Sequence, residues 1–187
     1  MNNNHNLEKL YDAGWDHYES GEKSKAFTLW KEAADLGYTK AQHIVGFCCY
    51  WGIGTKKDKS LALGWYQKAA EKDYPQSICY LAEYYEHGVA EIERNTEEAV
   101  RLWKKAAELG DKEAPFILGN LYYEGFYVSQ DKKEAVLWYR MSAQRLNQKA
   151  IKKMRELGEW IFSDNENDEW FGISYRDHPI ILLPEEK

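Results

Sequence analysis

The chain has 187 residues, a length that fits one domain or at most two small ones. Apolar residues make up 44% of it and charged residues 30%, a composition that excludes a wholly disordered chain. The formal net charge of −6 argues against general binding to the phosphates of nucleic acids. Aromatic residues reach 15%, with 8 Trp and 14 Tyr, and such residues are favoured both in protein cores and at interfaces.

An aromatic residue followed by two small residues recurs every 36 or 37 residues along the chain. Its four copies are Trp30-Lys-Glu-Ala33-Ala34, Tyr66-Gln-Lys-Ala69-Ala70, Trp103-Lys-Lys-Ala106-Ala107 and Tyr139-Arg-Met-Ser142-Ala143. Three further columns keep this register: Ala26, Ala62, Ala99 and Ala135; Gly14, Gly46, Ala82 and Gly119; and Gly21, Gly52, Gly88 and Gly125. Four columns in register predict four copies of one structural unit.

Each unit is expected to contain two helices. The first helices are predicted at 7–19, 40–51, 75–87 and 112–124, and the second helices at 23–36, 58–72, 95–109 and 131–146. Asp58, Asn95 and Asp131 precede second helices and are suited to cap them, while Gly37 and Gly110 suit helix ends. We expect the small residues to let the paired helices approach, with the recurring aromatic residue filling the space between them.

A fifth first helix, without a second helix to follow it, is predicted at 148–161. Its apolar residues form one stripe: Ile151, Met154, Leu157 and Ile161. Arg155 stands where the earlier units have a small residue, so the stack is expected to end there. A lone amphipathic helix meets the requirement for a cap on such an array.

These motifs resemble the Sel1-like repeat family, a relative of the tetratricopeptide repeats. The stretch Leu118-Gly119-Asn-Leu-Tyr122-Tyr123-Glu-Gly125 is similar to the family's first helix, and Trp65-Tyr66-Gln-Lys-Ala69-Ala70 is similar to its second. The resemblance covers about residues 7–157, and the first unit, which has a shorter turn, resembles a plain tetratricopeptide repeat. It implies an all-α fold, a right-handed α-solenoid of four helical hairpins plus a capping helix. It also implies a protein-binding scaffold with no reaction of its own and no cofactor.

The expected organisation is a repeat domain over residues 1–162 followed by an extended C-terminal tail over 163–187. The tail has seven acidic and two basic residues, and it combines the acidic run 164–169 with two short apolar runs. We expect it to dock on the last helices or in the groove of the solenoid, because free apolar termini favour aggregation. Direct binding of the tail to a partner is the alternative.

A binding groove is predicted on the first helices, which commonly line the concave surface of stacked hairpins. A helix face that is only exposed to solvent carries mostly charged and polar residues. The face beside the packed one is instead aromatic in the first two units and acidic in the third. The candidate partner-binding residues are Tyr11, Trp15, Tyr18, His43, Phe47, Tyr50, Trp51, Glu83, Glu86, His87, Phe116, Asn120, Tyr123 and Glu124. Such a face would suit a partner that presents Arg or Lys with apolar neighbours.

The competing interpretation is that these aromatic residues pack within a tightly curved solenoid or beneath the tail. On the other, packed face of the first helix, His17 is expected to be a hydrogen-bonded core residue.

Metal and catalytic sites are not expected. His43, Cys49, Cys79 and His87 fall in neighbouring units, where equivalent positions lie ~10 Å apart, too far for shared metal bonds. The thiols of Cys48, Cys49 and Cys79 are odd in number and suit a reduced core rather than a disulfide framework. Glu83 and Glu86 are more typical of a solvated or partner-facing surface than of acid–base catalysis. The basic run at Lys56, Lys57 and Lys59 is expected to be a solvated loop.

The function favoured by these features is a non-enzymatic protein-binding scaffold, more finely a bacterial immunity protein that neutralises a cognate basic toxin. An adaptor or a chaperone for a secreted effector is the alternative, and an enzyme or metal protein using the His- and Cys-bearing repeats is the weaker one. Self-association through an exchanged tail stays open. With no signal peptide at residues 1–6 and no long apolar stretch, a cytoplasmic location without membrane contact is expected.

Overall fold

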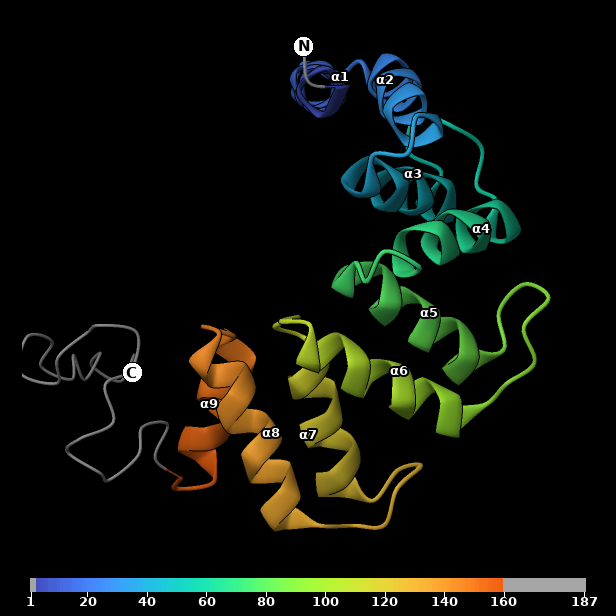
Figure 1. Ribbon diagram of the computed structural model, residues 1–187. Helices are drawn as coiled ribbons and strands as arrows, with labels where there is room; N and C mark the ends of the chain where they lie inside the picture. The colour runs from blue at the N-terminus through green and yellow to red at the C-terminus, as the bar shows by residue number, and fades with distance from the viewer. Residues whose placement is uncertain (1–2, 160–187) are drawn as a thin grey trace, which may run out of the picture.

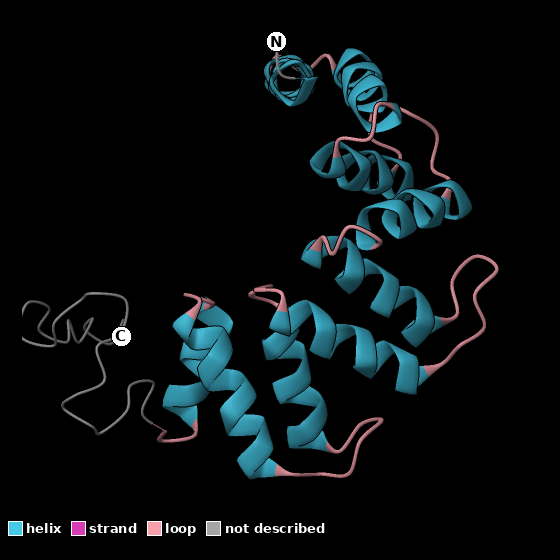
Figure 2. Ribbon diagram, in the orientation of Figure 1, coloured by secondary structure: helices cyan, strands magenta, loops and turns pink. Residues whose placement is uncertain are grey.

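The computed structural model describes residues 3–159, and within that range it contains nine α-helices and no strand (Figures 1 and 2). The helices are α1 (Asn3–Glu19), α2 (Lys23–Asp35), α3 (Thr39–Trp51), α4 (Lys59–Ala70), α5 (Pro75–His87), α6 (Thr96–Glu108), α7 (Ala114–Glu124), α8 (Lys132–Gln144) and α9 (Gln148–Glu156). Each odd-numbered helix up to α7 forms a hairpin with the next helix, which confirms the four predicted units. The predicted tail, 163–187, lies outside the described residues.

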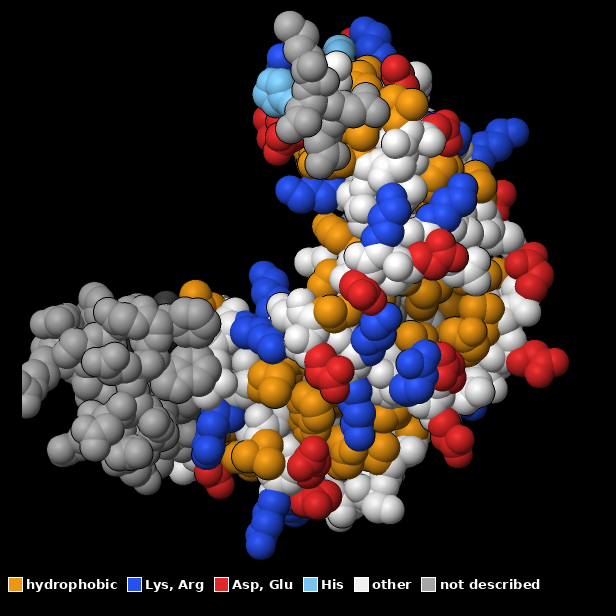
Figure 3. Space-filling view, in the orientation of Figure 1, with side chains coloured by type: hydrophobic (Ala, Val, Ile, Leu, Met, Phe, Trp, Pro, Cys, Tyr) orange, Lys and Arg blue, Asp and Glu red, His pale blue; other side chains and the backbone are white. Residues whose placement is uncertain are grey.

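The four hairpins stack in chain order along a curved path, and the last helix, α9, packs on α8 (Figure 1). In the N-terminal half the first helices, α1 and α3, lie on the inner side of the curve, while α2 and α4 lie on the outer side. The space-filling view shows the hollow on this inner side (Figure 3). Helices α1 and α3 therefore border a concave surface in this half of the array.

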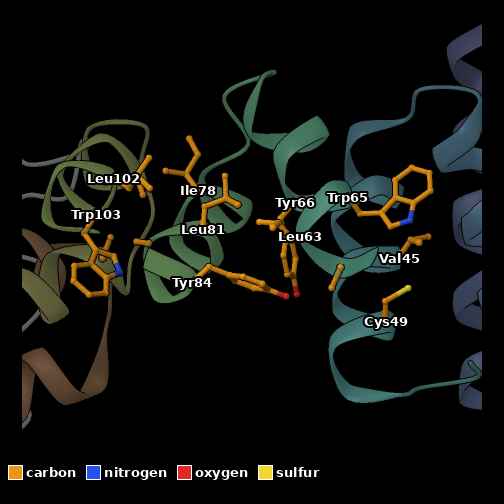
Figure 4. Packing of buried hydrophobic residues seen from close by; sticks show 14 of the residues in the cluster. Val45, Cys49, Leu63, Trp65, Tyr66, Ile78, Leu81, Tyr84, Leu102 and Trp103 are labelled. Carbon is orange, nitrogen blue, oxygen red and sulfur yellow. The ribbon is translucent and has the colours of Figure 1, made fainter. Parts of the chain in front are cut away.

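In three of the hairpins an aromatic side chain of the second helix packs against a glycine of the first, and the third hairpin has Trp103 and Ala82 at the equivalent positions. Trp30, Tyr66, Trp103 and Tyr139 are all at most 1% exposed, and Tyr66 and Trp103 belong to the row of buried side chains in Figure 4. A Cβ atom added at Gly119 would lie 2.5 Å from the Tyr139 ring. The ring thus occupies the space that a larger side chain would need, as the sequence predicted.

The turn inside each later hairpin follows one pattern. Gly52, Gly88 and Gly125 end the first helices with φ of 76°, 62° and 74°, the left-handed conformation that glycine adopts without strain. The chain then returns to the first helix, and the backbone N–H of Asp58 donates to the carbonyl of Cys49 over 2.8 Å.

The residues that end these three turns also cap the second helices. The Asp58, Asn95 and Asp131 side chains accept hydrogen bonds from N–H groups of the first turns of α4, α6 and α8, over 2.8–3.0 Å. The three predicted caps are confirmed. In the first unit the turn is shorter, and Glu22 precedes α2 without a side-chain cap.

Two sequence predictions were wrong: the burial of His17 and the residue at which α9 ends. The His17 side chain is 39% exposed, and its Nδ1 atom lies 2.6 Å from Glu22 Oε2, so it is hydrogen-bonded but not a core residue. Its contact is with Glu22 in the short turn between α1 and α2. Helix α9 ends at Glu156 instead of 161, because Gly158 turns the chain with φ of 68° and Glu159 N–H donates to the Met154 carbonyl.

A pair of glycine-to-alanine substitutions tests the packing between small and aromatic residues. Gly119→Ala should destabilise the protein by about 1–3 kcal/mol, because the new methyl group overlaps the Tyr139 ring. Gly64→Ala is the matched control, since its Cβ would have no neighbour within 4 Å, and it should stabilise α4 by about 0.5–1 kcal/mol. Urea denaturation measures both. Equal effects of the two substitutions would contradict the packing model.

Candidate functional site

The candidate residues recur at fixed positions relative to the small-residue column. Eleven of the fourteen lie three residues before, one residue after or four residues after it, and Trp51, His87 and Glu124 lie five residues after it. Each first helix thus presents the same face, although Cys79, at one of these positions, is not a candidate residue. The first position holds Tyr11, His43, Cys79 and Phe116, the second holds Trp15, Phe47, Glu83 and Asn120, and the third holds Tyr18, Tyr50, Glu86 and Tyr123. The structure divides this face into three regions with different surroundings.

The first region is a cavity of about 360 Å³ at the N-terminal half of the array. We call it the aromatic pocket; it is lined by Trp15, Tyr18, Trp30, His43, Ile44, Phe47, Cys48, Ile53, Gln76 and Tyr80. It brings together four of the candidate residues, Trp15, Tyr18, His43 and Phe47, from α1 and α3. Among the described residues no Asp, Glu, Lys or Arg lines it, so its polar groups are those of His43, Gln76, the two tyrosine hydroxyls and the tryptophan N–H groups.

The walls of the aromatic pocket are fixed by contacts with the core. The Trp15 ring lies 5.0 Å from that of the buried Trp30, with an angle of 63° between the planes. On the opposite wall Phe47 lies 6.2 Å from Tyr80, which stacks at 4.6 Å on the buried Tyr66. Side chains held in this way lose little conformational freedom when a ligand binds, which favours affinity.

His43 is a neutral polar group at the edge of this region. Its Nδ1 atom lies 3.0 Å from the Ser77 hydroxyl, and its ring lies 5.1 Å from Tyr74. Burial lowers the pKa of the imidazole to about 4, against a smaller opposing effect of the Asp111 charge. The pocket therefore offers His43 as a hydrogen-bonding group without charge near neutral pH.

The second region is a carboxylate patch on α5, formed by Glu83 and Glu86. Burial raises the pKa of Glu83, with His87 opposing and Glu86 reinforcing the shift. The Glu83 charge also helps to raise the pKa of Tyr80, after burial, which places this carboxylate beside a wall of the aromatic pocket. Neither glutamate forms an ion pair with Lys or Arg among the described residues, and Glu86 lies 3.4 Å from the exposed His87.

Tyr50 and Trp51 continue this region at the end of α3. Tyr50 packs 5.9 Å from Tyr84, whereas Trp51 is 55% exposed. Lys59 lies over the Tyr50 ring at 5.1 Å and Lys57 over the Trp51 ring at 6.0 Å, both in cation–π geometry. Part of the basic run at 56–59 is thus engaged with aromatic residues rather than purely solvated.

In the third region the candidate residues pack within the solenoid, as the competing interpretation predicted. Phe116 and Tyr123 lie 5.8 and 6.4 Å from the buried Tyr139, whose hydroxyl donates to Asn120 Oδ1 over 2.8 Å. Glu124 is exposed. Tyr11 behaves similarly at the other end, with its ring 5.5 Å from Tyr38. These residues support the fold as well as the surface.

Six residues of the aromatic pocket were not among the candidate residues: Trp30, Ile44, Cys48, Ile53, Gln76 and Tyr80. Of these, Trp30 and Cys48 were expected only as core residues. Tyr80 lies two residues before the small-residue column, where the second and fourth units have Ile44 and Ile117. This apolar column could have identified Tyr80 as a site residue, because in the second to fourth units it marks the side of the first helix that faces the preceding unit. Gln76 and Ile53 carry no comparable pattern, since their positions follow from how neighbouring units meet.

The cysteines are in environments that disfavour reactive thiolates. Burial raises the pKa of Cys48 to about 12 and that of Cys49 to about 11, and it raises that of Cys79 as well. In the part of the chain that the structure describes, no three His, Cys, Asp or Glu side chains are placed to share a metal ion. Over the same residues, no helix has the length and apolar character to cross a membrane.

Relatives among curated proteins cover most of this chain but only part of their own length. Chitin synthase regulatory factor 3 of Schizosaccharomyces pombe is 32% identical over 152 residues, which are 80% of this chain and 16% of that protein. DAP3-binding cell death enhancer 1 of Mus musculus is 34% identical over 179 residues, covering 77% of this chain and 35% of that protein. The chain thus spans at most about a third of these relatives.

Solved structures show the same architecture. A Sel1 repeat protein from Oxalobacter formigenes has a TM-score of 0.73 at 29% identity, covering 81% of this chain and 64% of that one. The protective antigen c5321 of uropathogenic Escherichia coli has a TM-score of 0.67 at 25% identity, covering 83% and 35%. The Sel1 repeat model matches residues 10–38, 39–74, 75–111 and 113–145. Because these four matches coincide with the four interlocked hairpins, the chain belongs to the Sel1 repeat family.

Proposed function

We propose that the chain is a protein-binding module whose partner inserts an apolar side chain into the aromatic pocket and places a neighbouring Lys or Arg against Glu83 and Glu86. The observation that carries this proposal is a preformed, uncharged aromatic pocket bordered by carboxylates that have no Lys or Arg partner among the described residues. Sel1 repeat proteins are generally non-catalytic scaffolds that bind other proteins, which supports the same class of function.

The chemistry of the pocket argues for a side-chain anchor from a protein. Binding energy at protein interfaces is concentrated in a few apolar or aromatic side chains that fill desolvated pockets. Trp15, Tyr18 and Phe47 supply the walls for such an anchor, and Gln76 and His43 supply hydrogen-bonding groups at its edge. Glu83 occupies in α5 the position that Phe47 occupies in α3, and it would attract a cation that flanks the anchor.

The net negative charge of the N-terminal part of the array supports a basic partner. Residues 1–130 contain 20 acidic and 15 basic side chains. Neutralisation of a basic toxin is the finer form of the function that we propose, and an adaptor role is its alternative. The fungal relatives named as chitin synthase regulators make a regulatory adaptor a natural comparison, although they are much longer chains.

Peptide selection followed by one substitution tests the pocket. Peptides selected from a random displayed library should contain an aromatic or aliphatic residue next to Lys or Arg. Phe47→Ala should weaken binding of the selected peptides at least about tenfold, since it removes one wall of the pocket. Calorimetry measures the affinity, and circular dichroism checks the fold of the variant.

Phe126→Ala is the matched control, because Phe126 is 61% exposed and lies outside the aromatic pocket. It should leave the affinity unchanged. Peptides that bind Phe47→Ala and the native chain equally would rule out the pocket as the binding site.

The carboxylate patch has a kinetic test. Replacing Glu83 and Glu86 together by Gln should slow association of the selected basic peptides several-fold at low salt and change dissociation less. The same double replacement at Glu97 and Glu108, two exposed positions of α6, is the control. Surface plasmon resonance at two ionic strengths measures both rates. Equal association rates for the two double variants would remove the carboxylate patch from the proposal.

The immunity role has its own test in cells. The native protein should restore growth to bacteria that express its cognate toxin, whereas Phe47→Ala should restore less and Phe126→Ala should restore as much as the native chain. Growth curves at matched expression levels measure the protection. Equal protection by the native chain and by Phe47→Ala would show that immunity does not depend on the aromatic pocket.

A further inference from the structure

The last helix of the array has an uncovered side. Helix α9 packs on α8 and, within the described residues, lacks the second helix that completes each earlier hairpin. Arg155 is exposed at the position where Gly119 receives the ring of Tyr139 in the preceding unit. Leu157 is only partly buried, although its counterpart Leu121 is 7% exposed. The apolar stripe of α9 is therefore incompletely covered by the solenoid.

A second cavity, of about 410 Å³, lies beside this helix and is rich in lysine. We call it the terminal surface; it consists of Tyr123, Lys132, Lys133, Val136, Leu157 and Glu159, together with Lys153. The Nζ atoms of Lys153 and Lys132 lie 4.5 and 5.5 Å from the centre of the Tyr123 ring. No carboxylate of a described residue forms an ion pair with Lys132, Lys133 or Lys153, while Glu159 lies 3.9 Å from Arg140.

The charge of this end of the solenoid is opposite to that of the segment that follows it. Residues 131–159 carry eight basic and four acidic side chains, whereas residues 160–187 carry seven acidic and two basic ones. The segment 160–187 starts directly after Glu159, which itself lines the cavity. Its acidic run begins at Asp164, and five residues span up to ~17 Å at ~3.4 Å each, enough to reach the lysines.

We propose that residues 163–187 dock on the terminal surface of their own chain. The acidic run 164–169 lies against Lys132, Lys133 and Lys153, and the aromatic residues that follow it, Trp170 and Phe171, cover Tyr123 and Leu157. Because the segment is tethered beside its site, its effective concentration there is about millimolar or higher, so weak contacts suffice. This docking completes the uncovered end of the array and leaves the aromatic pocket, on the other half of the molecule, open for a partner.

Limited proteolysis of the full chain with chymotrypsin tests this docking, because Trp170, Phe171 and Tyr175 are cleavage sites. Intact-mass spectrometry should show cleavage at least about tenfold slower than in a synthetic peptide of residues 160–187. The triple variant Lys132→Glu, Lys133→Glu, Lys153→Glu should raise the cleavage rate to near that of the peptide. The matched control is Lys9→Glu, Lys40→Glu, Lys56→Glu, which changes three exposed lysines far from the terminal surface and should leave the rate unchanged.

A reciprocal variant, Asp164→Lys, Glu166→Lys, Asp168→Lys, Glu169→Lys, keeps the test valid if the first triple variant fails to fold, because all four positions lie outside the repeats. It should also be cleaved faster. Native cleavage at the rate of the free peptide would overturn the proposal, as would equal rates in the two lysine variants. Protection that increases with protein concentration would instead assign the segment to a second copy and overturn docking within one chain.

Discussion

The close fit between a small residue on one helix and an aromatic ring on the next is the constraint on which the rest of this structure depends. The rings of Trp30, Tyr66 and Tyr139 occupy the space that a Cβ at Gly14, Gly46 and Gly119 would take. This contact holds the two helices of a hairpin at close distance without using the other faces of the first helix. It is local in sequence, so each unit can form it with few long-range contacts, as expected for a solenoid.

The proposed binding surface depends on this local packing. Since the packed face of each first helix is satisfied by its own hairpin, the adjoining face is free to vary between units. In α1 and α3 it carries the rings of the aromatic pocket, in α5 it carries Glu83 and Glu86, and in α7 it turns back to the core through Asn120. One helix geometry thus yields an apolar pocket and an acidic border side by side, which is a suitable arrangement for a basic segment with an apolar anchor.

Much of the fold could be predicted from the sequence, because the decisive contacts join residues that are close along the chain. The glycine turns, the Asp58, Asn95 and Asp131 caps and the interlocked rings all recur at a fixed period. The candidate site was predictable only in part, since it depends on how separate units meet. Tyr80 closes the pocket from the third unit, and His17 contacts Glu22 of the neighbouring turn instead of the core. The Asn147 side chain, which accepts hydrogen bonds from N–H groups at the start of α9, was not predicted as a cap because it lies between units, where the sequence repeats less closely.

The three turns anchored by Gly52, Gly88 and Gly125 have a consequence for how this scaffold can change. Their two ends are joined to the same first helix, by the glycine N–H at one end and by the returning N–H of Asp58, Asn95 or Asp131 at the other. Insertions between these anchors leave both helices in register, so this edge of the array can accept foreign loops. The turn after Gly52 contributes Ile53 to the aromatic pocket, whereas no residue of the turns after Gly88 and Gly125 lines it. Sequence variation in the latter two turns is therefore separable from the proposed recognition surface, and the two can diversify independently.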